Sequence, residues 1–165
     1  MASIQPITPK PGQESVWDYP RPPRVEATSK RIRVVFNGET IIDTTDSFRV
    51  LETSHPPTYY MPKDALQNVA FQKTARRTIC EFKGAATYWT ITVGDRTLKN
   101  GLWSYETPRA GFEPIKGYIA LYPAQMDACY VDDEQVQAQA GDFYGGWITS
   151  DIVGPFKGGM GTWGW

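Results

Sequence analysis

The 165-residue chain has ordinary hydrophobic content (41%), a raised aromatic content (13%) and a formal net charge of −1. A chain of this length can bury a full core without disulfides or metals, and its near-neutral charge gives no overall field toward nucleic acid or anionic lipid. The two cysteines do not suggest a secreted disulfide framework, and the sequence has neither a signal-like start nor a run of about eighteen apolar residues. We therefore expect a cytoplasmic protein without a membrane partner.

The first part of the chain is rich in proline. Residues 1–24 contain six prolines, which remove backbone donors and bias each preceding residue away from helix. This composition predicts an extended segment, and we expect residues 1–15 to form a flexible arm. Val16 and Trp17 would waste apolar surface in solvent, so we expect them to pack against a single β domain that spans residues 16–165.

The next segment predicts a hairpin. β-branched and aromatic residues flank Asn37 and Gly38, the pair that most readily adopts the positive φ angles of a tight turn. A third strand is predicted at residues 48–52 and ends at a Pro-Pro pair, which cannot continue a ladder of backbone hydrogen bonds. Residues 62–67 predict one short helix, because proline suits the first helical turn.

Three more strands are predicted later in the chain. Residues 87–93, 117–122 and 128–131 are rich in β-branched and aromatic residues, and a Gly-Asp turn follows the first of them. The chain shows no sustained helical periodicity and no alternation of strands with helices. We therefore predict an all-β fold, a compact antiparallel two-sheet domain with at most one short helix.

Glycine and aromatic residues dominate the last segment, residues 143–165. Its rings, among them Phe143, Trp147 and Trp163, would be costly to leave in water, so we expect an ordered tail that folds back onto the sheet. Residues 159–164 match the GxGxxG pattern of dinucleotide-binding proteins. That pattern requires a following helix, which the sequence does not provide, so we interpret the match as coincidental and expect no cofactor.

Few side chains could ligate a metal. A structural zinc site needs four cysteine or histidine ligands, and the sequence contains only His55, Cys80 and Cys129. The candidate aspartates lie at predicted turns, where acids commonly bond to the backbone. We therefore expect no metal site.

The only histidine lies at a predicted corner. His55 follows Glu52 where a strand meets the two prolines, and side chains at such corners often point into clefts. Cys80 has Lys83 nearby in sequence, and a thiol becomes a nucleophile when a base or a cation lowers its pKa. This pattern predicts a candidate catalytic set of Cys80, His55 and Glu52. The alternative is that His55 and Glu52 hold the corner by hydrogen bonds and that Cys80 is an ordinary buried thiol.

Aromatic residues recur at predicted strand ends and corners. With a few polar neighbours, such rings can line a pocket for a flat or cationic ligand, and they can equally fill the interior between two sheets. The candidate ligand-binding residues are Tyr60, Lys83, Tyr88, Trp89, Trp103, Tyr105, Trp147 and Asp151. Basic residues near Trp17 imitate a surface for single-stranded nucleic acid, but the balanced overall charge favours no nucleic-acid partner.

Five strings of the sequence together resemble a known family. They are ESVWDYPRPPRVE (14–26), RVLETSHPPTYY (49–60), ICEFKGAATYW (79–89), WSYETP (103–108) and FYGGWITSDIVGPFKGG (143–159). They are similar to the uncharacterised family catalogued as domain of unknown function 427, and the similarity covers nearly the whole chain.

The resemblance implies an all-β domain similar in architecture to methionine sulfoxide reductase B and to the ligand domain of cereblon, with two sheets arranged like a tent. It implies little about activity. The family is sometimes labelled nucleotidyltransferase, but the sequence lacks a convincing Mg²⁺-binding carboxylate set and a phosphate cradle. One lineage of these relatives uses a reactive cysteine and another an aromatic cage. Their zinc-binding cysteine pairs are absent here, so packing must hold the sheets together.

Three hypotheses follow. The leading one is a soluble domain that binds a small-molecule ligand of unknown identity in an aromatic-lined cleft, formed by residues 52–60, residues 80–89, Trp103 and two tail residues. The second is a thiol or acid–base enzyme that uses the cysteine, histidine and glutamate named above. The third is a structural protein that self-associates, for example as a homodimer, through residues 143–165.

Overall fold

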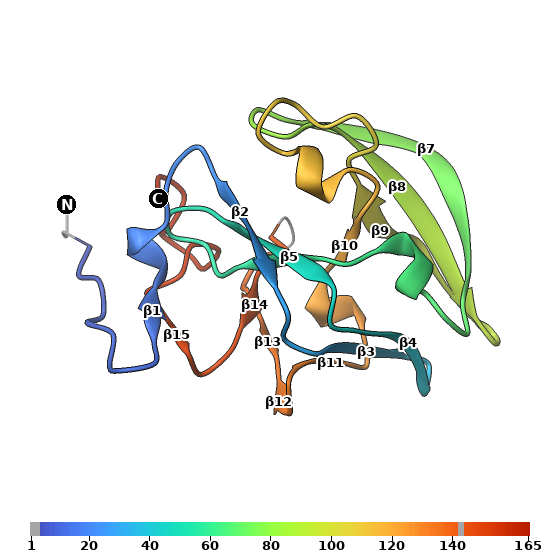
Figure 1. Ribbon diagram of the computed structural model, residues 1–165, viewed down its shortest axis with the longest axis horizontal. Coiled ribbons are helices and arrows are strands. Elements are labelled where there is room, and N and C mark those ends of the chain that lie inside the picture. Colours follow the sequence, from blue (N-terminus) through green and yellow to red (C-terminus); the bar gives the residue numbers. More distant parts are fainter. Residues whose placement is uncertain (1–3, 142–143) are drawn as a thin grey trace.

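β-strands joined by loops and single helical turns make up the protein (Figure 1). The computed structural model describes residues 4–141 and 144–165. Its strands are β1 (Glu14–Ser15), β2 (Arg24–Thr28), β3 (Ile32–Phe36), β4 (Glu39–Thr44), β5 (Ser47–Leu51), β6 (Thr58–Tyr60), β7 (Ala70–Cys80), β8 (Gly84–Val93), β9 (Arg96–Ser104), β10 (Ile119–Leu121), β11 (Ala128–Val131), β12 (Glu134–Gln135), β13 (Gln137–Ala138), β14 (Trp147–Ile148) and β15 (Ile152–Val153).

The helical segments of the described residues are four single turns of 3-10 helix. They are η1 (Val16–Asp18), η2 (Lys63–Ala65), η3 (Glu113–Ile115) and η4 (Pro123–Gln125). The predicted short helix corresponds to η2, which follows Pro62. The all-β class predicted from the sequence is confirmed, whereas the likeness to methionine sulfoxide reductase B stays a prediction.

One four-stranded antiparallel sheet has the order β10-β9-β8-β7 and is called the first sheet (Figure 1). The predicted turn at Gly94 joins β8 to β9, and its positive φ of 58° is one that glycine adopts without strain. β7 is the edge strand, and most of its side chains are exposed. Its ladder with β8 shifts register between Lys73 and Arg77, so the intervening residues form a bulge.

A second four-stranded sheet has the order β12-β11-β3-β4. The predicted hairpin joins β3 to β4, and both of its central residues have positive φ, 51° at Asn37 and 75° at Gly38. These angles give a turn whose twist matches the twist of the strands. β3 alternates buried and half-buried residues, so one face of this sheet packs into the interior.

A third sheet, of three strands in the order β2-β5-β6, adjoins the first sheet. The residue after β6, Met61, exchanges two backbone hydrogen bonds of 2.8 Å with Ile119 of β10. β6 itself alternates between the two faces of its sheet, so Tyr59 and Tyr60 point in opposite directions. This alternation decides which tyrosine lies in the interior and which faces the cavity described below.

The two ends of the described chain lie together (Figure 1). β1 pairs in parallel with β15, and the backbone amide of Ile7 donates to the carbonyl of Gly154 at 2.9 Å. Trp17 is tied to the same region, since its indole nitrogen donates to the carbonyl of Pro155 at 2.9 Å. These contacts agree with the expectation that Val16 and Trp17 pack against the body. The domain limits at residues 15 and 16 stay a prediction.

The tail expectation is met in part. Trp147 on β14 is fully buried, and β14 pairs with β13. Trp163, in contrast, is 93% exposed, so not every aromatic ring of this segment is buried. Phe143 lies outside the described residues.

Three hydrophobic clusters are formed by the described residues; the smallest contains Val16, Tyr19, Leu51 and Ile152, and the two larger ones are called the first and second cores. The first core is mostly aliphatic and contains Ile32, Val34, Phe36, Ile41, Ile42, Tyr59, Met61, Ile91, Val93, Leu102, Ile119, Leu121, Met126, Cys129, Val131 and Trp147. The second core is rich in tyrosine and tryptophan and contains Val50, Tyr60, Ala86, Tyr88, Trp103, Tyr105, Phe112, Ile115 and Ala120.

Candidate functional site

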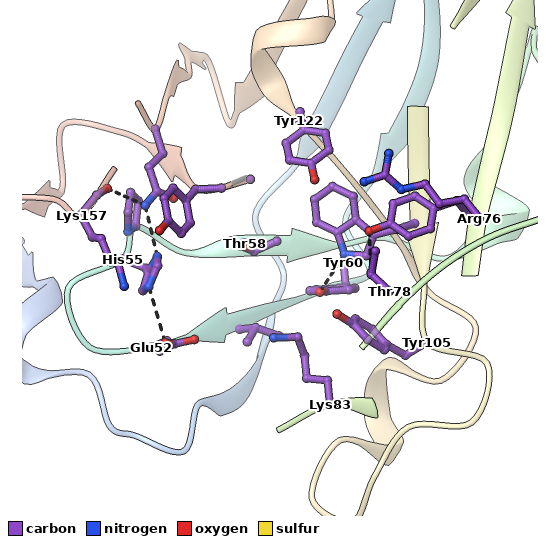
Figure 2. Close-up of a pocket in the computed structure, with 17 residues that line it drawn as sticks. Glu52, His55, Thr58, Tyr60, Arg76, Thr78, Lys83, Tyr105, Tyr122 and Lys157 are labelled. Atoms are coloured by element: carbon purple, nitrogen blue, oxygen red, sulfur yellow. Dashed lines mark hydrogen bonds and ion pairs between the residues drawn. The ribbon is translucent and has the colours of Figure 1, made fainter. Parts of the chain in front are cut away.

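A cavity of about 420 Å³ lies beside the second core (Figure 2). The first sheet supplies one side, and strands β5 and β6 of the third sheet supply the floor. The remaining side is closed by Gln139, Tyr144, Gly145 and Lys157. Five tyrosines and one tryptophan are among the residues that line it, and their phenol and indole groups give the aromatic wall polar atoms.

The aromatic wall is built by strand alternation. Trp103 and Tyr105 are two residues apart at the end of β9 and therefore share a face. The Trp103 indole nitrogen donates to the Tyr60 hydroxyl at 3.2 Å, and its ring lies 4.7 Å from the Tyr122 ring, centroid to centroid. The rings are thus held by β6, β9 and the segment after β10. Tyr88 on β8 adds a hydroxyl that shares a 2.8 Å hydrogen bond with Thr78.

The bulge in β7 brings a cation to the cavity. Arg76 lies between Lys73 and Arg77, where the β7–β8 ladder shifts register, and its guanidinium lies 4.7 Å from the Tyr88 ring centroid. Bulges commonly redirect a side chain in this way. Arg76 is exposed as a whole residue, so it lies at the mouth of the cavity.

Two lysines complete the charged lining. The Lys83 amine lies 5.8 Å from the Tyr105 ring centroid, and the Lys157 amine lies 5.8 Å from the Tyr144 ring centroid. Figure 2 shows Arg76, Lys83 and Lys157 on three sides of the cavity. No carboxylate oxygen of the described residues lies within 4.0 Å of their charged nitrogens. The three cations of the cavity therefore contact aromatic rings and form no ion pair with an acid of the described residues.

The pKa shifts of Lys83, Tyr60 and Tyr105 keep this lysine charged and these two phenols neutral. Burial lowers the pKa of Lys83, but Tyr60 and Cys80 outweigh burial and raise it above its usual value. Burial raises the pKa values of Tyr60 and Tyr105. At neutral pH Lys83 is consequently an ammonium group next to two protonated hydroxyls.

The opposite end of the cavity holds the corner predicted around His55. The Gln139 amide oxygen accepts from the Gly146 backbone amide at 3.1 Å, so the amide nitrogen of Gln139 must be the group that faces His55 Nδ1 at 3.2 Å. His55 Nδ1 is therefore the acceptor, and Nε2 carries the proton and faces Glu52 at 3.5 Å. Burial lowers the pKa of His55 to about 4, so the ring is neutral near pH 7.

Residues 24–132 match the family described as Domain of unknown function (DUF427). The chain belongs to this family. A search of curated proteins found no match.

The DUF427 match covers one part of the cavity and leaves another outside. The matched residues include the two sides of the cavity that β-strands form, and Tyr60, Lys83 and Trp103 are among them. Gln139 and Lys157, which close the cavity, come from the segment after the matched range. The site of this chain thus joins the family's sheets to a C-terminal segment.

Most predicted site residues of this DUF427 chain meet at the cavity. The lining includes Glu52, His55, Tyr60, Lys83, Tyr88, Trp103 and Tyr105. Cys80 lies next to this set: it packs on the second core and interacts with Lys83 and Tyr105.

Three predicted residues lie elsewhere. The Trp89 indole nitrogen donates to the Ser104 hydroxyl at 2.9 Å, and the Trp89 ring contacts the Lys63 amine at 4.5 Å. Trp147 is buried in the first core. Asp151 forms an ion pair of 3.0 Å with Lys30 and borders a separate surface depression. The structure does not bring these three side chains to the cavity.

Several lining residues were missed by sequence reasoning. They are Val50, Arg76, Thr78, Tyr122, Gln139, Tyr144, Gly145 and Lys157, while Pro56 and Thr58 fall within the predicted 52–60 corner but were not singled out. Thr58 carried a usable signal, because it is two residues before Tyr60 on a strand and therefore shares its face. Arg76 carried none, because a bulge sets its direction.

The described residues also bear on metals and membranes. Nowhere in 4–141 or 144–165 do three or more histidine, cysteine or acidic side chains gather as a metal site would require. Within the same residues, no helix is long and apolar enough to cross a membrane. Glu52 is the one carboxylate among the described lining residues, and Arg21 binds it at 3.2 Å.

Proposed function

We propose that this DUF427 chain is a binding domain that holds a small molecule with a flat ring in the cavity beside the second core. The observation that carries the proposal is convergence: Tyr60, Trp103 and Tyr122 come from distant parts of the sequence and surround one open space. Side chains that only filled an interior would leave no such space. The volume of about 420 Å³ lies in the range of roughly 300–1,000 Å³ that small-molecule sites occupy.

The lining suits a ring better than a flexible apolar chain. Trp103 and Tyr122 present ring faces and edges, against which an aromatic or unsaturated ligand can stack or lie edge to face. Phenol hydroxyls and the Gln139 amide region supply a few polar atoms that can fix its orientation.

The test compares two tyrosines that are matched in kind. Tyr122 lines the cavity, whereas Tyr130 lies on β11 with the Arg33 guanidinium 4.6 Å above its ring, and both are half-buried. Thermal shifts would be measured across a metabolite library for the wild type, Tyr122→Ala and Tyr130→Ala, and each hit would be confirmed by calorimetry. We expect hits that Tyr122→Ala loses and Tyr130→Ala keeps. Hits that survive both substitutions would show that the ligand binds elsewhere, and a library without hits would count against a ring-binding cavity.

The enzyme hypothesis, with Cys80, His55 and Glu52 as catalytic residues, has less support. Both ring nitrogens of His55 already face partners, Gln139 and Glu52, so the ring has no free lone pair to accept a proton from a thiol. Lys83 and the Tyr105 hydroxyl are the described groups beside Cys80 that could stabilise a thiolate. Iodoacetamide labelling against pH distinguishes the two views: ordinary reactivity of Cys80 would remove the enzyme hypothesis.

The hypothesis of self-association through residues 143–165 and the cytoplasmic location also stay predictions. Met160 and Trp163 are almost fully exposed in that segment and could serve a homodimer. Sedimentation of Trp163→Ser against the wild type tests this, because an unchanged mass would exclude a contact centred on this ring.

A further inference from the structure

The positive charge of the cavity has no acidic counterpart within the protein. Most cations that the described structure pairs with acids lie elsewhere; Arg31 with Asp43 at 2.8 Å and Lys63 with Glu106 at 2.8 Å are examples. Arg76, Lys83 and Lys157 have no such partner, and they meet at one space. Three unpaired cations that converge leave an electrostatic gap which an anion would fill.

The single nearby carboxylate does not fill that gap. Glu52 is held by Arg21 at 3.2 Å and faces His55 Nε2 at 3.5 Å. Figure 2 shows it on the His55 side of the cavity, while Arg76 lies on the Tyr122 side. Its charge is therefore already shared at one end, and the Arg76 guanidinium at the other end remains available.

Unused hydrogen-bond donors lie at the same end. The Tyr60 hydroxyl accepts from the Trp103 indole nitrogen, and it donates to no acceptor among the described residues. The Arg76 guanidinium likewise donates to no described acceptor. A guanidinium fork, an ammonium group and a phenol together match the several lone pairs of a carboxylate or phosphate.

We infer that the ligand of the proposed binding function is a small ring compound that carries an oxyanion, a carboxylate or a single phosphate, and that Lys83, Arg76 and the Tyr60 hydroxyl bind this group. The inference rests on the proposed function and adds the chemical class of the ligand. The ring would contact Trp103 and Tyr122, and the oxyanion would lie between Lys83 and Arg76. Lys157 adds a favourable field from the third side.

The size of the cavity limits this class. A space of about 420 Å³ admits one ring with its acidic group and excludes long polyanions. Two of the three cations, Lys83 and Arg76, are proposed to contact the oxyanion, and a group with one or two negative charges matches these two.

The experiment uses probes that differ in charge and keep the ring. Benzoate and phenyl phosphate carry the two oxyanions, and benzamide is the neutral counterpart of benzoate. Binding would be followed on the full-length protein by backbone amide chemical shifts. We expect both anions to bind at least roughly tenfold more tightly than benzamide, and the stronger of the two identifies the oxyanion that the site prefers.

Two pairs of variants locate the anion. Lys83→Met and Arg76→Gln remove cavity cations, whereas Lys63→Met and Arg33→Gln remove cations of similar setting, each stacked on a ring outside the cavity. The two cavity variants should each lose roughly tenfold in affinity for benzoate, and the two controls should lose little. Melting curves check that each variant is folded. If a cavity variant does not fold, the salt dependence of the wild type decides, because added salt should weaken benzoate binding and leave benzamide binding unchanged.

The outcomes separate this inference from the proposed function. If benzamide binds as tightly as benzoate and Tyr122→Ala abolishes both, the cavity binds rings but the oxyanion inference is wrong. If Lys63→Met weakens benzoate as much as Lys83→Met does, the anion does not bind in the cavity. If no ring compound binds, the proposed function itself fails.

Discussion

Leu102 and Trp103 are neighbours on β9, yet they belong to different cores. The first core, on the Leu102 side, is mostly aliphatic, and none of the described residues that form it lines the cavity. The second core, on the Trp103 side, carries hydroxyl and indole groups and borders the open space. The raised aromatic content of the chain therefore has a location: much of it surrounds the cavity, where a ring with a polar end has a use that leucine cannot supply.

The largest expected effect on this comparison is the loss of stability when Leu102, in the first core, is truncated. Leu102→Ala should lower the unfolding free energy by about 2–5 kcal/mol, because a fully buried leucine leaves a void. Chemical denaturation measures this loss, and benzoate binding by the folded variant should persist. Trp103→Phe should show the reverse, with a smaller loss of stability and a larger loss of affinity. Equal effects of the two changes on both quantities would end the distinction between the cores.

The next effect depends on pH and concerns the corner that closes the cavity. The folded pKa of His55 is lowered from 6.5 to about 4, so between these values the unfolded chain binds a proton that the folded chain does not. The contribution of His55 to the unfolding free energy is therefore fully present above pH 6.5. It is lost as the pH falls from 6.5 to the folded pKa of about 4, and the total loss is about 3 kcal/mol.

His55→Gln isolates this contribution. The charged groups that face the ring are Glu52, Lys157, Arg21 and Lys83, and they remain in the variant. Unfolding free energies measured across the acid range should therefore fall less steeply for the variant than for the wild type. Parallel curves for the two proteins would show that His55 does not titrate differently on folding.

A third effect tests how closely the C-terminal segment approaches the aromatic wall. A β-carbon added at Gly145 would lie 2.6 Å from the Trp103 ring, whereas one at Gly159 would have nothing within 4 Å. Gly145→Ala should cost about 1–3 kcal/mol and disturb the Trp103 fluorescence, because overpacking forces the ring to move. Gly159→Ala is the matched control in the same segment. Equal stability of the two variants would show that this segment yields freely.

The smallest effect compares two hydroxyls of the second core. Tyr60→Phe leaves the Trp103 indole nitrogen without its acceptor and should cost about 1–3 kcal/mol. The Tyr105 hydroxyl has a weak hydrogen-bond partner, the Cys80 sulfur, so Tyr105→Phe should change stability by less than about 1 kcal/mol. Thermal denaturation of both variants checks the order, and a larger loss for Tyr105→Phe would contradict the hydrogen-bond assignment.

Local sequence signals predicted much of the fold. The hairpin at Asn37 and Gly38, the strand over 128–131 and the turn at Gly94 follow from backbone preferences of a few residues, and the structure confirms all three. β7 was missed because an exposed edge strand has no need of apolar alternation. Composition alone cannot distinguish such a strand from a polar loop.

The candidate site was predictable only where the alternation of side chains along a strand determines which residues face the cavity. Tyr60 and Trp103 were found because they are aromatic and lie on strands, but Trp89 and Trp147 have the same character and face other surroundings. Which face of a strand packs on which core depends on the packing of whole sheets. The sequence of one strand does not carry this information. Lys157 was out of reach for another reason: it comes from an irregular segment whose position depends on distant contacts.

The cavity wall contributed by Gln139, Tyr144 and Lys157 can form only after the sheets that it closes, as the chain leaves the ribosome. The strands of both four-stranded sheets can pair once residue 135 has emerged, but the space stays open on one side until Lys157 follows. A ligand that needs the closed site would therefore bind only chains that extend to Lys157 and would add its binding free energy to their stability alone.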